Sequence, residues 1–279
     1  MTILLFIYKM IIGAHIPRET TIIKTMDQIK INGGNALQIF TTNPRSTNIS
    51  DNTKYINESH LIKKYCNINK FALVVHGPYV LNIAKPFKIG KREIEIMDTF
   101  IYNDIITANY IGAIGYIIHV GKYLTNSKED AIYIMRYNIK NLLKTMAANN
   151  IKTKLVLETP AGQGTELLSD FKDFINFYYS FTEEERHLFK LCIDTCHIWN
   201  AGYELYEVLP LIPDKNDIIV IHANNSKNIK GARVDRHEFI LEGKILADDI
   251  KSFIEEFEKS IIILEMPSYN YKDEFKFIS

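Results

Sequence analysis

Cysteine is scarce in this chain. Its 279 residues include only three cysteines, at positions 66, 192 and 196. An odd, low count is typical of proteins from a reducing compartment. A chain of this length can bury a core large enough to fold without disulfide bonds. The C-x3-C spacing of Cys192 and Cys196 is not that of a zinc ribbon, so we expect both thiols to pack in the core.

Net charge and long apolar runs are also missing. Lys and Arg number 33, as do Asp and Glu. This balance neither predicts nor excludes a nucleic-acid partner, because a local basic face can bind phosphates. No segment reaches the roughly 20 apolar residues of a membrane span. Residues 1–9 lack the basic start of a signal peptide. We therefore expect an intracellular protein without a membrane partner, in which residues 1–9 are a dispensable extension or follow an upstream start codon.

Short apolar runs rich in β-branched residues recur along the chain. The eight runs cover residues 11–16, 36–40, 71–77, 116–121, 154–159, 189–196, 217–224 and 261–266. They do not alternate with polar residues, as is typical of strands buried on both faces. Helix-like stretches lie between most of them, at 19–32, 58–69, 90–111, 128–149, 170–180 and 246–258. This alternation predicts one α/β domain, residues 1–279, folded as a TIM (β/α)8 barrel. A doubly wound sheet competes, but no glycine-rich dinucleotide fingerprint follows the first run.

Polar residues that can bind metals or protons stand where the apolar runs end. They are His76, His119, Glu158, Asp194, His197, His222 and Glu265, together with Asp235 and His237 in the loop between the last two runs. The carboxyl ends of all strands in such a barrel open on one face, where active sites are built. One histidine at a strand end is usually just hydrogen-bonded. Nine such residues at one end therefore predict a shared site. His60 and His187 stand in polar segments and are expected to be surface residues.

Imidazole and carboxylate without thiolate suit zinc, and also manganese or iron. Nine ligands are too many for one zinc ion, so three ions with one bridging carboxylate fit better. Asp235 and His237 are two residues apart, and in an extended segment both would point the same way and bind one ion. Asp194 and His197 can serve different ions. His15 ends the first run and is expected to support ligands or substrate.

Several motifs now identify a family. They are LETPAGQG (157–164), LCIDTCHIWNAGY (191–203) and ARVDRHEFILEG (232–243), with HGPYVLN (76–82), IIHVGK (117–122) and ILEMP (263–267). On these motifs the chain resembles endonuclease IV, a zinc-dependent family that cuts DNA at abasic sites, from Ile11 to about Pro267. The D-T-C-H and V-D-R-H segments together are highly specific for that family.

The resemblance implies three zinc ions. One would be bound by His76, His119 and Glu158, a second by Glu158, Asp194, His222 and Glu265, and a third by His197, Asp235 and His237. Glu158 would bridge the first two, and Glu265 would orient or deprotonate the attacking water. Hydrolysis 5′ to the abasic sugar would leave a 3′-hydroxyl and a 5′-deoxyribose phosphate. Members also trim blocked 3′ ends and are typically monomeric, so double-stranded DNA with abasic sites or blocked 3′ ends is the expected partner.

The reaction requires the damaged nucleotide to leave the helix, which costs least where the base is missing. The family pattern F-x-x-N-x-R appears as Phe40, Asn43 and Arg45. Arg45 and Tyr79 are expected to enter the base stack as wedges. Basic residues of the strand-end loops are expected to contact phosphates: Arg18, Lys122, Lys227, Lys230, Arg233 and Arg236.

Two other functions compete with the nuclease. A sugar isomerase or epimerase on the same barrel would use one or two metals and has no need of Asp235, His237 or the Asn43–Arg45 loop. A non-catalytic binder of damaged DNA would have a decayed metal site, which the full set of nine residues does not suggest. A metal content near three favours the nuclease, and one near one favours the isomerase.

Overall fold

A computed structural model describes residues 10–89, 91–266 and 271–279. Eight parallel strands close into a barrel. They are β1 (Ile11–His15), β2 (Ala36–Phe40), β3 (Ala72–His76), β6 (Gly115–His119), β7 (Lys154–Glu158), β8 (Phe189–Asp194), β9 (Ile218–His222) and β12 (Ile261–Leu264). Each pairs with the next in chain order, and β12 closes on β1. The predicted TIM-barrel fold is confirmed. The expectations for residues 1–9 and for Pro267 lie outside the described residues.

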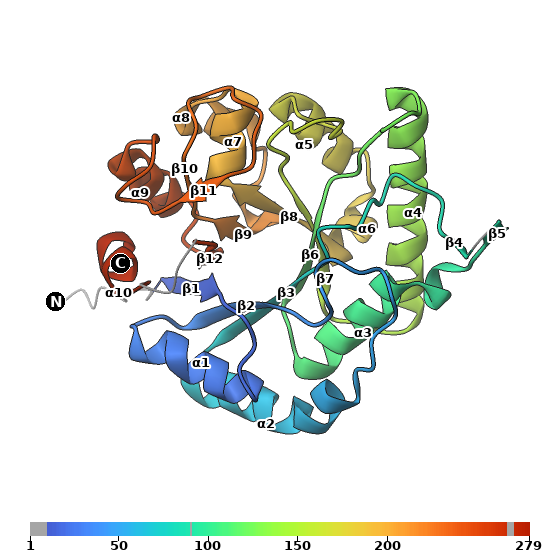
Figure 1. Ribbon diagram of the computed structural model, residues 1–279, viewed down its shortest axis with the longest axis horizontal. Helices are drawn as coiled ribbons and strands as arrows, with labels where there is room; N and C mark the ends of the chain where they lie inside the picture. Colours follow the sequence, from blue (N-terminus) through green and yellow to red (C-terminus); the bar gives the residue numbers. More distant parts are fainter. Residues whose placement is uncertain (1–9, 90, 267–270) are drawn as a thin grey trace, which may run out of the picture.

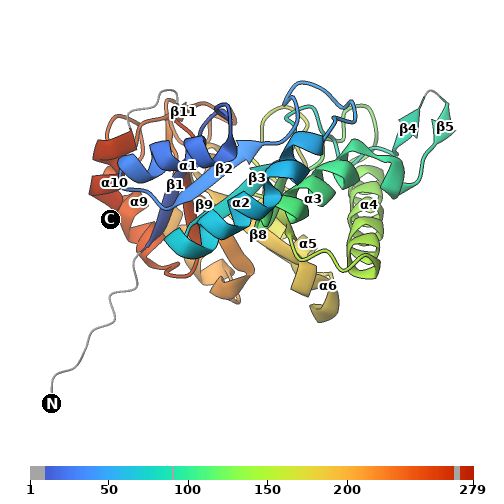
Figure 2. The same cartoon turned by 90° about the horizontal axis from the view of Figure 1, so that it is seen from below.

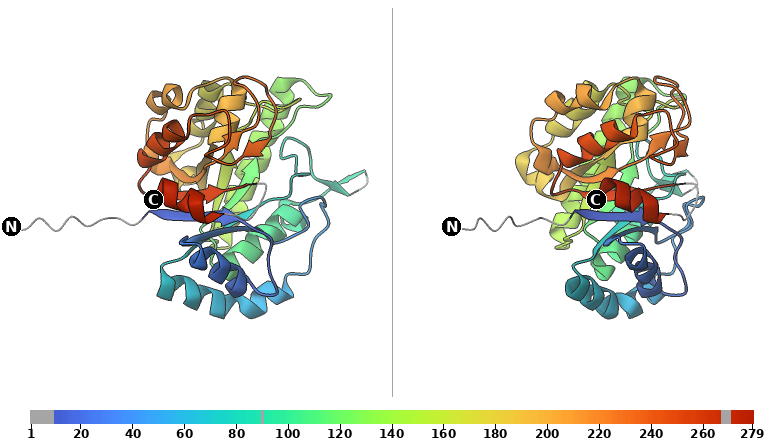
Figure 3. Two further views of the ribbon diagram at one scale, coloured as in Figure 1. Left: turned by 60° about the vertical axis from the view of Figure 1, so that its left-hand side comes forward. Right: turned by 90° about the vertical axis from the view of Figure 1, so that its left-hand side faces the viewer.

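Helices surround the barrel (Figure 1). They are α1 (Ile22–Ile31), α2 (Thr53–Asn69), α3 (Phe100–Ile111), α4 (Lys128–Ala148), α5 (Phe171–Tyr179), α6 (Glu183–Leu188), α7 (Thr195–Ala201), α8 (Leu205–Val208), α9 (Ala247–Glu255) and α10 (Tyr271–Ile278). Short 3-10 turns cover Ile96–Asp98, Leu209–Leu211 and Lys215–Asp217. The last helix, α10, lies beside β1, as Figure 3 shows. Among the described helices, none is long and apolar enough to cross a membrane.

Two small hairpins stand outside the barrel. Strands β4 (Lys88–Ile89) and β5 (Arg92–Glu93) form one, and β10 (Asn225–Ser226) and β11 (His237–Glu238) form the other. In the side view of Figure 2, β11 and the β4–β5 hairpin lie near the upper edge, at opposite sides of the molecule. The second hairpin follows β9 directly and carries one of the predicted ligands, so it brings a distant loop back to the strand ends.

The predicted helix over 90–111 is wrong in its first part. Strand β5 and a 3-10 turn occupy that part, and α3 begins only at Phe100, where the Thr99 side chain accepts a hydrogen bond from the Tyr102 amide. The predicted strand over 189–196 is also too long. It ends at Asp194, whose carboxylate accepts from the His197 amide and starts α7. Local capping, which apolar patterns do not reveal, sets both boundaries.

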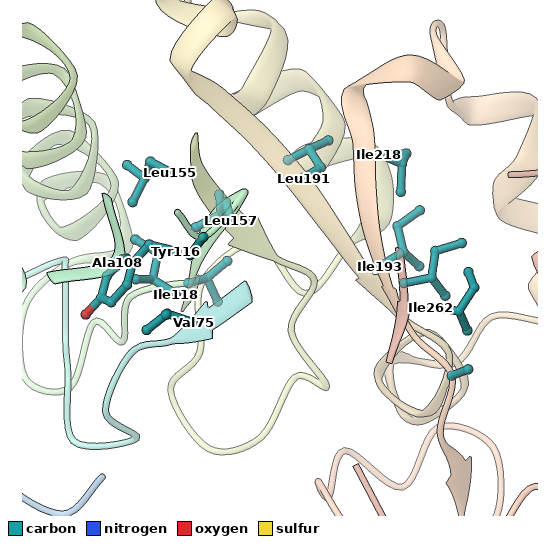
Figure 4. Packing of buried hydrophobic residues seen from close by; sticks show 14 of the residues in the cluster. Val75, Ala108, Tyr116, Ile118, Leu155, Leu157, Leu191, Ile193, Ile218 and Ile262 are labelled. Atoms are coloured by element: carbon teal, nitrogen blue, oxygen red, sulfur yellow. The ribbon is translucent and has the colours of Figure 1, made fainter. Parts of the chain in front are cut away.

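Apolar side chains fill both sides of the barrel wall. One buried cluster comes mainly from strand residues such as Val74, Ile117, Val156 and Val220, and includes Cys192. The other joins the alternate strand positions to the helices, as Figure 4 shows around Val75, Tyr116, Ile193 and Ile262. Burial on both faces explains why the strands read as unbroken apolar runs. Cys192 and Cys196 are buried and free, which confirms them as packing thiols.

Candidate metal centre

Eight of the nine predicted ligands come together in three groups at one end of the barrel, and the ninth, Asp235, has its Oδ1 3.1 Å from Nε2 of His237. Three groups of ligand atoms each lie within 4.8 Å of one another: His76, His119 and Glu158; Glu158, Asp194, His222 and Glu265; and Asp194, His197 and His237. The groups share Glu158 and Asp194, so they form one continuous cluster. A pocket of about 290 Å³ opens onto it. The geometry therefore has the carboxylate-linked sets that a multinuclear centre needs, while the assignment of each ligand stays a prediction.

Glu158 lies at the middle of the cluster and is only 1% exposed. Its Oε2 is 3.2 Å from Nε2 of His76 and 3.6 Å from Nε2 of His119. Its Oε1 is 2.9 Å from Nδ1 of His222 and 3.5 Å from Nδ1 of His197. Burial raises the pKa of Glu158, but the facing imidazoles of His119 and His222 outweigh burial and hold that pKa well below its usual value. The two oxygens of one ionised carboxylate thus face two sides of the cluster.

Backbone carbonyl groups fix three of the histidine rings. Nδ1 of His76 bonds the Gly77 carbonyl at 2.7 Å, and Nδ1 of His197 bonds the Thr159 carbonyl at 2.7 Å. Nδ1 of His237 bonds the Glu265 carbonyl at 3.1 Å. A carbonyl oxygen only accepts, so each Nδ1 must carry a proton, and each Nε2 points toward the cluster, where it can bind either a second proton or a metal ion.

Each of these Nε2 atoms faces carboxylate oxygens, which is repulsive unless a proton or a metal ion lies between the nitrogen and the oxygen. Nε2 of His197 is buried without a hydrogen-bond partner among the described residues, 3.4 Å from Oδ1 of Asp235 and 4.0 Å from Oδ2 of Asp194. Nε2 of His237 lies 3.1 Å from the same Asp235 oxygen and 3.4 Å from Oδ2 of Asp194. Metal-binding histidines in proteins usually have this arrangement, with the other ring nitrogen held by an outer partner. The residues present therefore fit a bound metal.

Two residues that sequence reasoning missed support the cluster. Gln38 is fully buried, its Oε1 lies 2.9 Å from Nε2 of His222, and its Nε2 donates to Oε1 of Glu265 at 2.6 Å. Asn224 donates from Nδ2 to Oδ2 of Asp194 at 2.7 Å and accepts from the Glu265 amide at 2.8 Å. In the sequence, both residues could have been found as polar side chains that stand in or just after an apolar run.

His15 lies where the sequence placed it, with its Nδ1 3.3 Å from Oε1 of Glu265 and 2.9 Å from Nε2 of Gln38. Burial lowers the pKa of His15, so its ring is predominantly neutral near pH 7. The contact suits the supporting role predicted for it, which stays a prediction.

The residues predicted to enter the DNA lie at the edge of the pocket or on a loop beside it. Tyr79 lines the pocket, is 59% exposed, and has its ring 5.1 Å from that of Phe40. Asn43 and Arg45 are on the loop after β2, where Oδ1 of Asn43 accepts from the Arg45 amide. Burial raises the pKa of Tyr79 above 10, so it stays a neutral phenol. An exposed aromatic ring with a fixed base is suited to stacking on nucleobases.

Of the predicted phosphate contacts, four are engaged in ion pairs. The pairs are Arg18 with Glu58 (2.6 Å), Lys122 with Glu166 (3.6 Å), Lys227 with Glu238 (3.8 Å) and Lys230 with Glu204 (2.6 Å). Arg233 and Arg236 have no carboxylate partner among the described residues, and Arg236 lines the pocket. Arg236 is therefore the best placed of the six to meet a phosphate at the centre.

Replacing Gln38 with Met should weaken metal binding. The change keeps the length of the side chain but removes the partners of His222 and Glu265, and loss of such an outer partner typically costs about 10- to 100-fold in metal affinity. Competition against a chromogenic chelator measures the affinity. Gln28→Met is the matched control, because Gln28 lies on α1 and its side chain donates to Glu19, outside the cluster. Equal affinities in the wild type and Gln38→Met would contradict the supporting role.

Comparison with known proteins shows the family. The family model described as a xylose isomerase-like TIM barrel matches residues 26–278. A protein of Metamycoplasma arthritidis (strain 158L3-1) named probable endonuclease 4 is 33% identical over 259 residues, which make up 88% of this chain and 89% of that protein. A protein of the same name from Mycoplasmopsis agalactiae is 32% identical and is matched over 85% of this chain and 84% of its own length.

Solved structures show the same barrel in two functional classes. Endonuclease IV from Thermus thermophilus has a TM-score of 0.73 at 20% identity, with 95% of each chain covered. A D-tagatose 3-epimerase-like protein has a TM-score of 0.69 at 16% identity, also with 95% of each chain covered. At these identities the structural similarity shows the fold alone, so the relatives in sequence decide between the classes. The chain belongs to the endonuclease IV family.

Proposed function

We propose that this protein is an endonuclease that hydrolyses the DNA phosphodiester 5′ to an abasic site. The observation that carries the proposal is the cluster of three carboxylates and five imidazoles, linked through Glu158 and Asp194 and joined by Asp235 beside His197 and His237, in a chain whose sequence relatives are named probable endonuclease 4. The products would be a 3′-hydroxyl and a 5′-deoxyribose phosphate. The same hydrolysis at blocked 3′ ends would give a 3′-phosphodiesterase activity.

Three zinc ions are the proposed cofactors. His76, His119 and Glu158 would bind the first, and Glu158, Asp194, His222 and Glu265 the second. The third would be bound by His197, Asp235 and His237, with Oδ2 of Asp194 close to two of these rings. Zinc in these sites would supply Lewis acidity toward a phosphodiester and make water a stronger acid at neutral pH.

Glu265 is placed to hold the attacking water. Its side chain is 14% exposed and lines the pocket. Burial raises its pKa, but the charge of His222 and the hydrogen bond from His15 outweigh burial and keep that pKa well below its usual value. An ionised carboxylate fixed by Gln38 would accept a hydrogen bond from water and aim its oxygen at the phosphorus. Orientation would therefore be the main contribution of this residue.

Recognition of the damaged DNA would involve the residues at the edge of the pocket. An abasic nucleotide leaves the helix at low cost, and the side chains of Tyr79 and Arg45 would occupy the gap. Arg236, on the loop that carries Asp235 and His237, would contact a phosphate next to the scissile bond. These contacts would select a distorted duplex over an intact one.

Incision of an end-labelled duplex with one abasic analogue tests the function. The reaction contains EDTA and no added magnesium, because a deeply buried zinc cluster should survive brief chelation while a magnesium nuclease would stop. A single cut 5′ to the lesion, with a metal content near three per chain, is expected. No cut by a protein that holds its metal would reject the nuclease, and a metal content near one would favour the sugar isomerase.

Replacing Arg236 with Ala should weaken DNA binding and reduce its dependence on salt. Loss of one phosphate contact is expected to lower the slope of log affinity against log salt by about one unit. Fluorescence anisotropy with a labelled abasic duplex at several salt concentrations measures the slope. Lys259→Ala is the matched control, because Lys259 precedes β12 and so lies at the opposite end of the barrel. An unchanged slope in Arg236→Ala would reject the phosphate contact.

A further inference from the structure

The loop that carries Asn43 and Arg45 is tethered to helix α3. It spans residues 41–52, between β2 and α2. Oγ1 of Thr42 donates to Oδ2 of Asp104 at 3.1 Å. Nδ2 of Asn103 donates to the Ser50 carbonyl at 3.2 Å, and Nδ2 of Asn52 donates to Oδ1 of Asn103 at 3.4 Å. Two consecutive residues of α3 thus bind the loop near both of its ends, on either side of Arg45.

Asp104 also lies beneath the neighbouring loop. Its Oδ2 accepts a second hydrogen bond, from the hydroxyl of Tyr116 at 3.2 Å. That hydroxyl packs against Gly77, where an added Cβ would lie only 2.9 Å away from it. Gly77 begins the segment that leads to Tyr79. One carboxyl group therefore connects the bases of the two loops that present Arg45 and Tyr79.

Stability alone does not explain this carboxyl group. Asp104 is 1% exposed, and its Oδ1 is buried without a hydrogen-bond partner among the described residues. A buried polar oxygen without a partner costs free energy, and an apolar residue of similar size would avoid that cost. Burial also raises the pKa of Asp104 to about 7. The side chain of Asp104 accepts from Thr42 and Tyr116, neither of which is among the nine residues of the centre.

We propose that Asn103 and Asp104 are positioning residues that hold the loop 41–52 in the shape in which Arg45 enters the DNA. The inference rests on the proposed function and deepens it, because it assigns lesion recognition to a helix that touches neither metal nor substrate. Thr42 transmits the constraint from Asp104 to the loop. The bond between Thr42 and Asp104 then supports binding of the damaged duplex and leaves the hydrolytic chemistry unchanged.

Thr42→Val tests this inference, because it removes one hydroxyl and keeps the shape of the side chain. Thr153→Val is the matched control, since Thr153 is a buried threonine whose hydroxyl donates to the Ala113 carbonyl just before β7 begins, at the opposite end of the barrel. We expect Thr42→Val to raise KM for an abasic duplex by up to about tenfold, the effect of losing one intramolecular hydrogen bond. Its kcat, and its turnover of the small diester bis(4-nitrophenyl) phosphate, should equal those of the wild type.

A double-mutant cycle with Arg45→Ala separates positioning from a general loss of structure. If the bond acts through Arg45, Thr42→Val has no further effect on KM in the Arg45→Ala background. An equal rise in both backgrounds, a rise no larger than in Thr153→Val, or a parallel loss of small-diester turnover would each overturn the inference. A wild-type chain that does not cut the abasic duplex overturns the proposed function and the inference with it, whereas one that cuts without coupling overturns the inference alone.

Discussion

Replacing Glu158 with Gln is expected to abolish DNA cleavage. The amide keeps the size of the side chain but loses the charge that faces His76, His119, His197 and His222 at once. A neutral amide cannot bridge two cations, so two of the three ligand groups lose their common member. We expect the rate to fall by at least about 1,000-fold, the upper end of the cost of removing one electrostatic group. Incision of the abasic duplex and metal content per chain are the two measurements.

Glu274→Gln is the matched control for that variant. Glu274 is also a buried glutamate, but it accepts from the Ile240 amide and lies outside the cluster. It should cut DNA at the wild-type rate and keep its full metal content. If Glu158→Gln retained both properties as well, the bridging role of Glu158 would be wrong even though the fold is right.

Removing the metal should abolish activity and lower the melting temperature. A ligand that binds only the folded state stabilises it by about 4 kcal/mol when its free concentration is about 1,000 times its Kd. For a chain of this size, that predicts a fall in Tm of about 10 °C. Dialysis against a strong chelator, followed by calorimetry and by readdition of Zn²⁺, tests both effects. An unchanged Tm, or activity that survives complete removal, would reject a structural metal centre.

The amount of metal that the protein retains during dialysis should decrease as the pH is lowered. Burial lowers the pKa of His237, but the carboxylates of Asp194 and Asp235 outweigh burial and raise that pKa to about 9. Below about pH 9 the metal-free centre therefore holds a proton on this ring, and a metal ion has to displace it. Metal retention should fall as the pH is lowered through and below that pKa. Equal retention at alkaline and mildly acidic pH, measured by atomic emission after dialysis, would show that His237 binds no metal.

The strands and the candidate centre could be predicted from the sequence for one physical reason. Strands buried on both faces are continuous apolar runs, so the first polar residue marks the end of each strand, as at His76, His119 and Glu158. Parallel pairing then brings all of these ends to one face of the barrel. The ligand positions at the strand ends therefore follow from a local pattern and a single topological rule, whereas those of His197, Asp235 and His237 lie beyond the strands.

The parts that sequence reasoning missed depend on partners far away in the chain. Lys122 appears available for phosphates in the sequence, but the structure pairs it with Glu166. Gln38 looks like a stray polar residue until the barrel places it beside His222 and Glu265. Such pairings cannot be read from local patterns.

Three of the imidazole rings are oriented by main-chain carbonyls, those of Gly77, Thr159 and Glu265. Every residue has a carbonyl group, so substitutions at Thr159 that keep the backbone path leave this constraint intact. The orientation of the rings is then inherited with the path of the chain and not with the identity of neighbouring side chains. Over evolutionary time, the side chains around the centre can change extensively while the rings continue to point to the same place.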